Sequence, residues 1–186
     1  LLSRYNKNGG DGSVWGQRIG IDSIPQLTGV ISVKSPKRNF SVKDPQIVDG
    51  CYQIGSVEEL YGFALYVNSY SLSRSYDAPP PFCAKLTKDI VVNKNVLKND
   101  TLNGNDDEFI SWIPINGFSG SFDGAGHSIS GLYFNGDGVD VGLFGSVLDR
   151  DENDVVKIEN LSIDDSYFNA RANIGAIVGA VEYSKS

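Results

Sequence analysis

A single histidine limits the acid–base chemistry that this chain could perform. His127 stands in a glycine-rich stretch beside Ser128 and close to Asp123, so a Ser-His-Asp arrangement would have to use these residues. Close neighbours along one strand or turn do not form such a triad, because its three side chains converge in a fixed geometry. We therefore interpret His127 as a turn residue whose ring forms a hydrogen bond with the backbone, and we predict no catalytic residue.

Aspartates could supply the carboxylate pair of an enzyme that cleaves glycosides, in which the two carboxyl groups stand about 5–10 Å apart. The candidates are Asp123, Asp137, Asp140, Asp149, Asp151, Asp154, Asp164 and Asp165. Most of them lie in turn-like segments, where an aspartate side chain commonly bonds to the backbone two residues further on. The sequence therefore favours a non-enzymatic protein, with a polysaccharide-cleaving enzyme as an alternative.

Two oxygen-rich segments, 103–108 and 149–154, are the candidate calcium loops. Neither has the ligand spacing of an EF-hand, so we interpret both as solvated loops. One histidine and two cysteines cannot form a four-ligand zinc site or an HExxH centre. No cofactor is expected, with a weak surface Ca²⁺ site as the alternative.

The composition excludes two classes of partner. Sixteen Lys and Arg residues against 23 Asp and Glu residues give a net charge of −7, which argues against binding to nucleic acid. The longest apolar run covers residues 60–67, far short of the roughly 20 residues that span a membrane. The length of 186 residues suits one domain, or one domain with an extension.

Cys51 and Cys83 are the only cysteines. An even count without a CxxC motif fits one disulfide in an exported protein, and two unrelated thiols are the alternative. The chain has no methionine, and residues 174–181 are still strand-like. We therefore expect the chain to be a piece of a longer parent protein.

A capping box predicts one helix, over about 57–68. Ser56 and Glu59 can each bond to an unpaired backbone N–H, and the apolar residues from 60 to 67 recur at helical spacing. Residues 1–50 read as a β-rich or extended appendage, with short strands expected near 14–21, 27–33 and 40–42. From residue 84 onward, short alternating apolar segments end at Gly or Asn, which is typical of strands and turns.

The later part of the chain repeats. Segments 131–135 and 141–145 are followed by the similar segments 160–164 and 174–179, and the two units begin 29 residues apart. A repeat of this size with strand-length segments predicts a β-solenoid, whose units must stack because none covers its own apolar face. The predicted helix would cap the first coil, since an open sheet edge needs a cover.

Segments 112–115, 118–129 and 141–145 resemble the GLUG-motif repeats of bacterial secreted and surface proteins, and 52–60 with 84–90 resemble the lead-in to those repeats. The likeness covers residues 51–179, with a looser last unit. It implies an all-β, right-handed parallel β-helix with an N-terminal capping helix, and it supplies no catalytic residues. The positions predicted to be structural parts of the repeat are Trp112, Pro114, Phe118, Gly120, Phe122, Asp123, Gly124, Gly126, His127, Ile129, Leu132, Gly142, Leu143, Phe144, Gly145, Leu161, Gly175 and Gly179.

These observations predict an appendage at 1–50 and a capped β-helix at 51–186. The expected function is that of a non-enzymatic, adhesin-like module of a bacterial secreted or cell-surface protein, which presents or spaces a binding surface for glycans or a host surface. Such repeats also occur in immunoglobulin A peptidases, so an accessory region of a large secreted peptidase is an alternative. A carbohydrate-binding surface is another alternative, because exposed aromatic rings can stack on sugars. The candidate rings are those of Tyr5, Trp15, Tyr70, Tyr76, Tyr133 and Tyr167.

Overall fold

The computed structural model describes residues 14–16, 26–28, 41–72, 81–149 and 155–183. The chain divides into two compact units, Leu1–Lys34 and Ser35–Ser186, whereas the sequence suggested a boundary after residue 50. In the first unit, β1 (Val14–Gly16) and β2 (Gln26–Thr28) form an antiparallel pair. They overlap the expected strands near 14–21 and 27–33, whose other parts lie outside the described residues.

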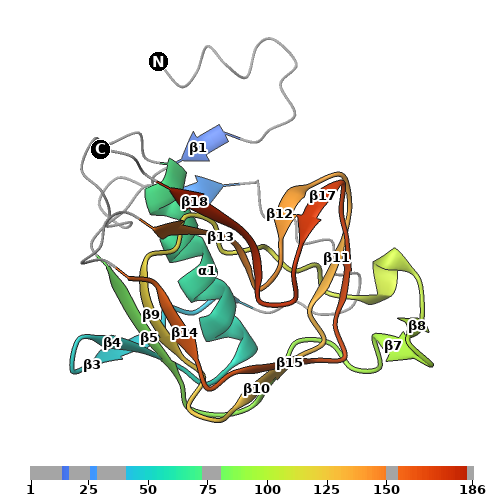
Figure 1. Cartoon of the computed structure of the whole chain (residues 1–186), viewed down its shortest axis with the longest axis horizontal. Coiled ribbons are helices and arrows are strands. Elements are labelled where there is room, and N and C mark those ends of the chain that lie inside the picture. Colours follow the sequence, from blue (N-terminus) through green and yellow to red (C-terminus); the bar gives the residue numbers. More distant parts are fainter. Residues whose placement is uncertain (1–13, 17–25, 29–40, 73–80, 150–154, 184–186) are drawn as a thin grey trace. The chain divides into compact units, whose positions relative to one another are not determined.

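The described residues of the second unit form one α-helix and many short strands (Figure 1). The helix is α1 (Val57–Leu72), and η3 (Asp106–Glu108) is a short 3₁₀ turn. The strands are β3 (Gln46–Val48), β4 (Cys51–Ile54), β5 (Phe82–Leu86), β6 (Ile90–Val91), β7 (Leu97–Lys98), β8 (Thr101–Leu102), β9 (Gly120–Asp123), β10 (Ser128–Ser130), β11 (Tyr133–Asn135), β12 (Val139–Val141), β13 (Phe144–Asp149), β14 (Lys157–Glu159), β15 (Ser162–Asp164), β16 (Tyr167–Asn169), β17 (Ala172–Ile174) and β18 (Val178–Tyr183). The described part of the chain is therefore mainly β, as predicted.

The predicted capping box begins α1. The backbone N–H of Glu59 donates to Oγ of Ser56 (3.2 Å), and Oε2 of Glu59 accepts the N–H of Gly55 (2.9 Å). The helix continues four residues beyond the predicted end. Its last turns are held by tertiary contacts, because the Asn68 side chain bonds to the backbone of the 114–116 segment and the Tyr70 ring packs against Phe82.

Parallel pairing dominates the second unit. Each strand between residues 157 and 183 lies beside its counterpart between 120 and 149, from β14 on β9 to β18 on β13. Segment 82–118 pairs in the same way, through β5 and β6 and through single bridges at Ser111, Ile115 and Phe118. The sheets are short and mixed, and they do not close; the largest has the order β14-β9-β5-β4-β3 with β3 antiparallel.

The predicted repeat spacing of 29 residues is wrong for the first strand of the repeating unit. Tyr133 lies opposite Tyr167 rather than Ser162, so the step between matching positions is 34 residues and not 29. The identical triplets Tyr-Phe-Asn at 133–135 and 167–169 mark this register. The second predicted pairing is confirmed, because Val141 lies opposite Ile174 and Phe144 opposite Val178.

Polar side chains pair between repeats as well as strand backbones. Asp140 and Asn173 both adopt a left-handed backbone, with φ of 57° and 53°, and Nδ2 of Asn173 donates to Oδ1 of Asp140 (2.6 Å). The side chains of Asn135 and Asn169 are joined in the same way at 2.7 Å. These two side-chain bonds join β12 to β17 and β11 to β16 across the step between repeats.

The core lies between α1 and the inner faces of the strands. Phe63 is fully buried, and its ring centroid lies 5.5 Å from that of Tyr52 and 6.2–6.3 Å from those of Phe82, Phe118 and Phe122. Figure 1 shows α1 crossing the middle of the second unit, with β5, β9 and β14 to one side and β11, β12 and β17 to the other. One aromatic side chain thus joins the helix to the strands of two successive repeats.

Gly62 explains how the chain before β3 packs against α1. A Cβ atom at position 62 would lie 2.1 Å from the carbonyl oxygen of Lys43.

We therefore expect Gly62→Ala to lower the free energy of unfolding by about 1–3 kcal/mol through overpacking, although alanine favours an isolated helix by about 1 kcal/mol. Denaturant titration measures this change. Ser69→Ala on the exposed side of α1 is the control, and a Gly62→Ala variant more stable than the parent would contradict the packing.

Candidate functional site

A polar cleft lies beside the N-terminus of α1, where β3 and β4 meet the residues that follow β5. Its volume is about 430 Å³, within the range of small-ligand sites. Charged, amide and hydroxyl side chains line it together with one glycine: Lys43, Gln46, Gln53, Gly55, Ser56, Glu59, Thr87 and Lys88. A lining of this kind suits a hydroxyl-rich or charged ligand rather than an apolar one.

Strand pairing positions the amide side chains of the cleft. Gln46 lies opposite Gln53 in the β3–β4 ladder, and Gln53 lies opposite Lys85 on β5. The ladder extends beyond β5, because the N–H of Thr87 donates to the carbonyl of Ile54 (2.9 Å). Residues of β3, of β4 and of the segment after β5 thus come together beside the N-terminus of α1.

Glycine is required at position 55 for this convergence. A Cβ atom there would lie 2.4 Å from Oγ1 of Thr87, which is far below normal contact. Oγ1 of Thr87 also donates to the carbonyl of Ile54 at 3.3 Å. The end of β4 and the Thr87 side chain therefore pack closely and form one wall of the cleft.

The carboxylate of Glu59 is already neutralised within the protein. Its Oε1 lies 2.7 Å from Nζ of Lys43, and its Oε2 accepts the N–H of Gly55. The hydrogen bond from Lys43, with a smaller contribution from Gly55, lowers the pKa of Glu59 despite partial burial. The same ion pair raises the pKa of Lys43. Both groups are therefore charged at neutral pH.

Several polar atoms of the cleft are left for a ligand. Nε2 of Gln53 donates to the carbonyl of Cys51 (3.1 Å), which leaves its Oε1 as an acceptor. Ser56 uses Oγ to accept the N–H of Glu59 and retains its hydroxyl proton for donation. The cleft therefore presents both donors and acceptors, as recognition of sugar hydroxyl groups requires.

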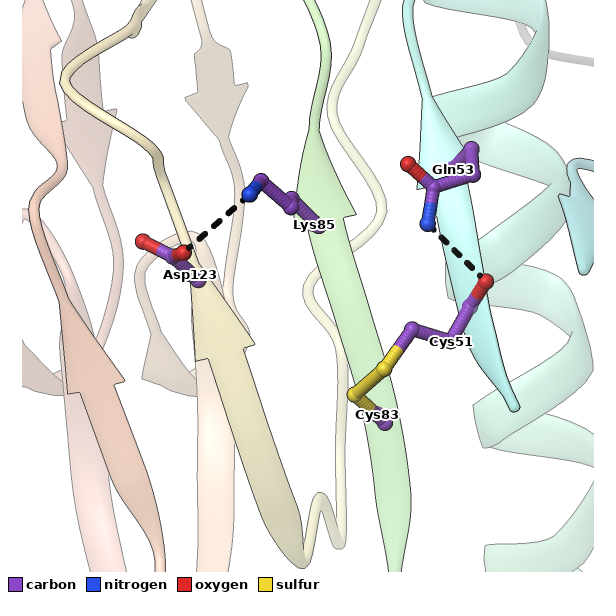
Figure 2. The surroundings of a disulfide bond; sticks show 5 residues. All are labelled: Cys51, Gln53, Cys83, Lys85 and Asp123. Carbon is purple, nitrogen blue, oxygen red and sulfur yellow. Dashed lines mark hydrogen bonds and ion pairs between the residues drawn. A yellow bond between two sulfur atoms is a disulfide. The ribbon is translucent and has the colours of Figure 1, made fainter. Parts of the chain in front are cut away.

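The predicted disulfide between Cys51 and Cys83 is confirmed. It joins the adjacent parallel strands β4 and β5, with the two Cα atoms 4.5 Å apart. Figure 2 shows it on the same face of the sheet as Gln53, Lys85 and Asp123. The bond thus fixes the two strands that lead into the cleft.

His127 is placed differently from the expectation. Its Nδ1 lies 3.3 Å from Oδ1 of Asp89 on the segment between β5 and β6, so its ring contacts a carboxylate and not the backbone. The same carboxylate oxygen accepts the N–H of Ser128 (2.9 Å), and these contacts lower the pKa of Asp89, with the backbone bond as the main cause. The sequence missed Asp89 because it lies 38 residues away along the chain.

Three of the carboxylates considered for glycoside cleavage, those of Asp123, Asp140 and Asp165, accept hydrogen bonds within the protein. Oδ1 of Asp123 accepts the N–H of Ala125 (2.8 Å), as the Asx-turn interpretation predicted, and also the Asn160 amide. These bonds lower the pKa of Asp123, the Asn160 bond most strongly. The side chain of Asp165 accepts the N–H groups of Val96 and Leu97 and so anchors the start of β7. Asp151 and Asp154 lie outside the described residues.

Only the first candidate calcium loop is described along its whole length. There Asp106 accepts hydrogen bonds from Tyr133 and Asn135, and the Tyr133 bond contributes most to lowering the pKa of Asp106. Burial, followed by this hydrogen bond, raises the pKa of Tyr133 to about 12. Within the described residues, no group of three or more His, Cys, Asp and Glu side chains is placed to hold a metal ion. Most of loop 149–154 falls outside them.

Most of the residues predicted to be structural parts of the repeat fall into two groups. The first is buried in the core: Trp112, Phe118, Phe122, Ile129, Leu132, Leu143 and Phe144. The second lies at turns or close backbone approaches: Gly120, Gly124, Gly126, Gly142, Gly145, Gly175 and Gly179. Pro114 supplies a carbonyl to Asn68, while Leu161 is half-buried in the last repeat.

Three of the six candidate sugar-stacking aromatics can be assessed. Tyr133 is buried and stacks on Tyr167, with ring centroids 5.8 Å apart. Tyr70 packs against Tyr66 and Phe82. Tyr5, Tyr76 and the Trp15 side chain lie outside what the structure describes.

Sequence reasoning did not identify the cleft. Its residues come from an irregular segment, two strands, a helix cap and a loop. They therefore have no regular spacing in the sequence from which the cleft could be predicted. The one available signal was Gly55 directly before the capping box, since a glycine there marks a close approach.

No helix in the described part of the chain is both long and apolar enough to cross a bilayer. Comparisons with family models, curated proteins and solved structures gave no match.

Proposed function

We propose that the chain is a non-enzymatic, glycan-binding module of a bacterial secreted or cell-surface protein. Its scaffold is a right-handed parallel β-helix of the GLUG-repeat kind, with α1 as the cap over the first coil. The polar cleft beside α1 is the binding site in this proposal.

Three features support the scaffold. Successive repeats pair strand by strand in parallel, and the side chains of Asp140 and Asn173 are hydrogen-bonded between the matching strands β12 and β17. Small residues recur where coils approach closely; a Cβ atom on Gly142 would lie 2.5 Å from the carbonyl oxygen of Gly175. Phe63 places the helix against the first two coils, as a cap requires.

The cleft is the observation that carries the binding role. It combines amide, hydroxyl and lysine side chains around an internally neutralised Glu59. Such a lining offers hydrogen bonds but contains a single carboxylate, Glu59, whose pKa is lowered, whereas glycoside hydrolysis uses two carboxyl groups, one of them with a raised pKa. The Cys51–Cys83 disulfide is compatible with an oxidising compartment outside the cytoplasm.

A glycan panel tests this function. Purified protein should bind at least one soluble oligosaccharide saturably in calorimetric titration, and the paired Gln46→Ala/Gln53→Ala variant should bind it at least tenfold more weakly. Asn105→Ala removes an amide that does not line the cleft and is the matched control. Absence of binding across neutral and acidic oligosaccharides, or unchanged affinity of the paired variant, would contradict the proposal.

A further inference from the structure

We infer that the ligand of the cleft is a carboxylated sugar, a uronate or a sialic-type residue, whose carboxylate pairs with Lys88. This inference rests on the proposed glycan-binding function and names the chemical class that the cleft selects. It follows from which charges around the cleft already have partners.

Two acidic residues close to Lys88, Glu59 in space and Asp89 in the sequence, form their hydrogen bonds and ion pairs with other groups. Glu59 holds Lys43 at 2.7 Å and the N–H of Gly55. Asp89, the next residue in the chain, accepts the N–H of Ser128 and contacts the His127 ring. Among the described residues, none forms an ion pair with Lys88.

The side chains that line the cleft therefore carry one net positive charge, in a chain whose net charge is −7, and Lys88 also acts electrostatically on Glu59 without forming an ion pair with it. Two lysines and one glutamate line it, and the Lys43–Glu59 pair cancels internally. A lysine ammonium donates charge-assisted hydrogen bonds to a carboxylate, and these are stronger than neutral ones. The negative charges elsewhere on the surface are screened over about 8 Å at physiological ionic strength. The charges of the residues that line the cleft therefore determine which ligand it attracts.

The neutral polar groups suit the rest of a sugar ring. Ser56 can donate its hydroxyl proton, Oε1 of Gln53 can accept, and the Gln46 amide can do both. Sugar acids present a carboxylate together with several ring hydroxyl groups, so a single residue would engage Lys88 and these groups at once. An inorganic anion could accept from Lys88, Ser56 and Gln46 but would donate nothing to Oε1 of Gln53, and a neutral sugar would leave Lys88 without a carboxylate partner.

Calorimetric titration with charged and uncharged forms of the same sugars tests the inference. The probes are short oligomers of galacturonate, glucuronate and mannuronate, a sialyl-oligosaccharide, and the methyl esters of each. We expect at least one acidic oligomer to bind, its methyl ester to bind at least tenfold more weakly, and Lys88→Gln to abolish this preference. Lys98→Gln, on the exposed hairpin strand β7, is the matched control and should change nothing.

The outcomes separate this inference from the function on which it rests. Equal binding of acid and ester, or undiminished acid binding by Lys88→Gln, would overturn the acidic-sugar assignment while leaving a glycan-binding cleft. Sodium sulfate binding as tightly as the acidic oligomer would also overturn it, because the site would then recognise only an anion. If acidic forms fail while neutral oligosaccharides bind, the inference is wrong and the proposed function stands.

Discussion

Phe63→Ala is expected to lower the free energy of unfolding by about 3–5 kcal/mol, the range for truncating a buried aromatic side chain. Phe63 is fully buried, and its ring contacts Phe82, Phe118 and Phe122 on the strands of two repeats. Because these partners are packed around α1, they cannot collapse into the space without moving the helix. The cost should therefore lie toward the upper end of the range.

Urea titration followed by far-ultraviolet circular dichroism measures this loss. Leu65→Ala on the same helix is the control, because Leu65 is only half-buried and should cost clearly less. The helix should also dissociate from the sheet more readily in the Phe63→Ala variant, which increased amide hydrogen exchange across α1 would show. A loss below about 1 kcal/mol would mean that Phe63 does not join the helix to the strands.

Removing the disulfide is expected to cost about 3–4 kcal/mol of stability. The bond closes a loop between residues separated by 32 positions, and the chain-entropy model gives this magnitude for a loop of that length. The paired Cys51→Ser/Cys83→Ser variant should therefore unfold at markedly lower denaturant. Because β4 and β5 also carry the cleft, we expect this variant to bind its glycan more weakly than the parent does.

Reductant supplies the control for this prediction. Dithiothreitol should destabilise the parent protein by a similar amount and leave the paired serine variant unchanged, because only the parent has a bond to reduce. Equal stability of the two proteins under oxidising conditions would show that the bond adds nothing to the native state. Free thiols in the intact mass of protein isolated from its natural source would show that it does not form there.

Local signals in the sequence predicted local structure well. The Ser56–Glu59 capping box located the start of α1, and Asp123 forms the expected turn with Ala125. The pairing of Cys51 with Cys83 could also be predicted, because no other cysteine exists. In each case the interacting groups, or the absence of any competing group, could be read directly from the chain.

The predictions that failed depended on which distant segments meet. The repeat was aligned through Leu132 and Leu161, whereas the register pairs Tyr133 with Tyr167. Similar apolar residues permit several alignments, and side-chain packing selects one of them. The contact between His127 and Asp89 has the same origin, since strand pairing brings two loops together. The cleft combines Lys43 with Lys88 from distant segments, which no local pattern encodes.

The most direct test of the proposed site is a titration of ¹⁵N-labelled protein with the tightest-binding oligosaccharide from the panel, followed by amide chemical shifts. The glycan-binding cleft predicts saturable shifts that are largest at Gln53, Gly55, Ser56, Thr87 and Lys88. Little change is predicted on the hairpin of β7 and β8. Shifts centred on another face, or none at a saturating concentration, would contradict the assignment of this cleft as the binding site.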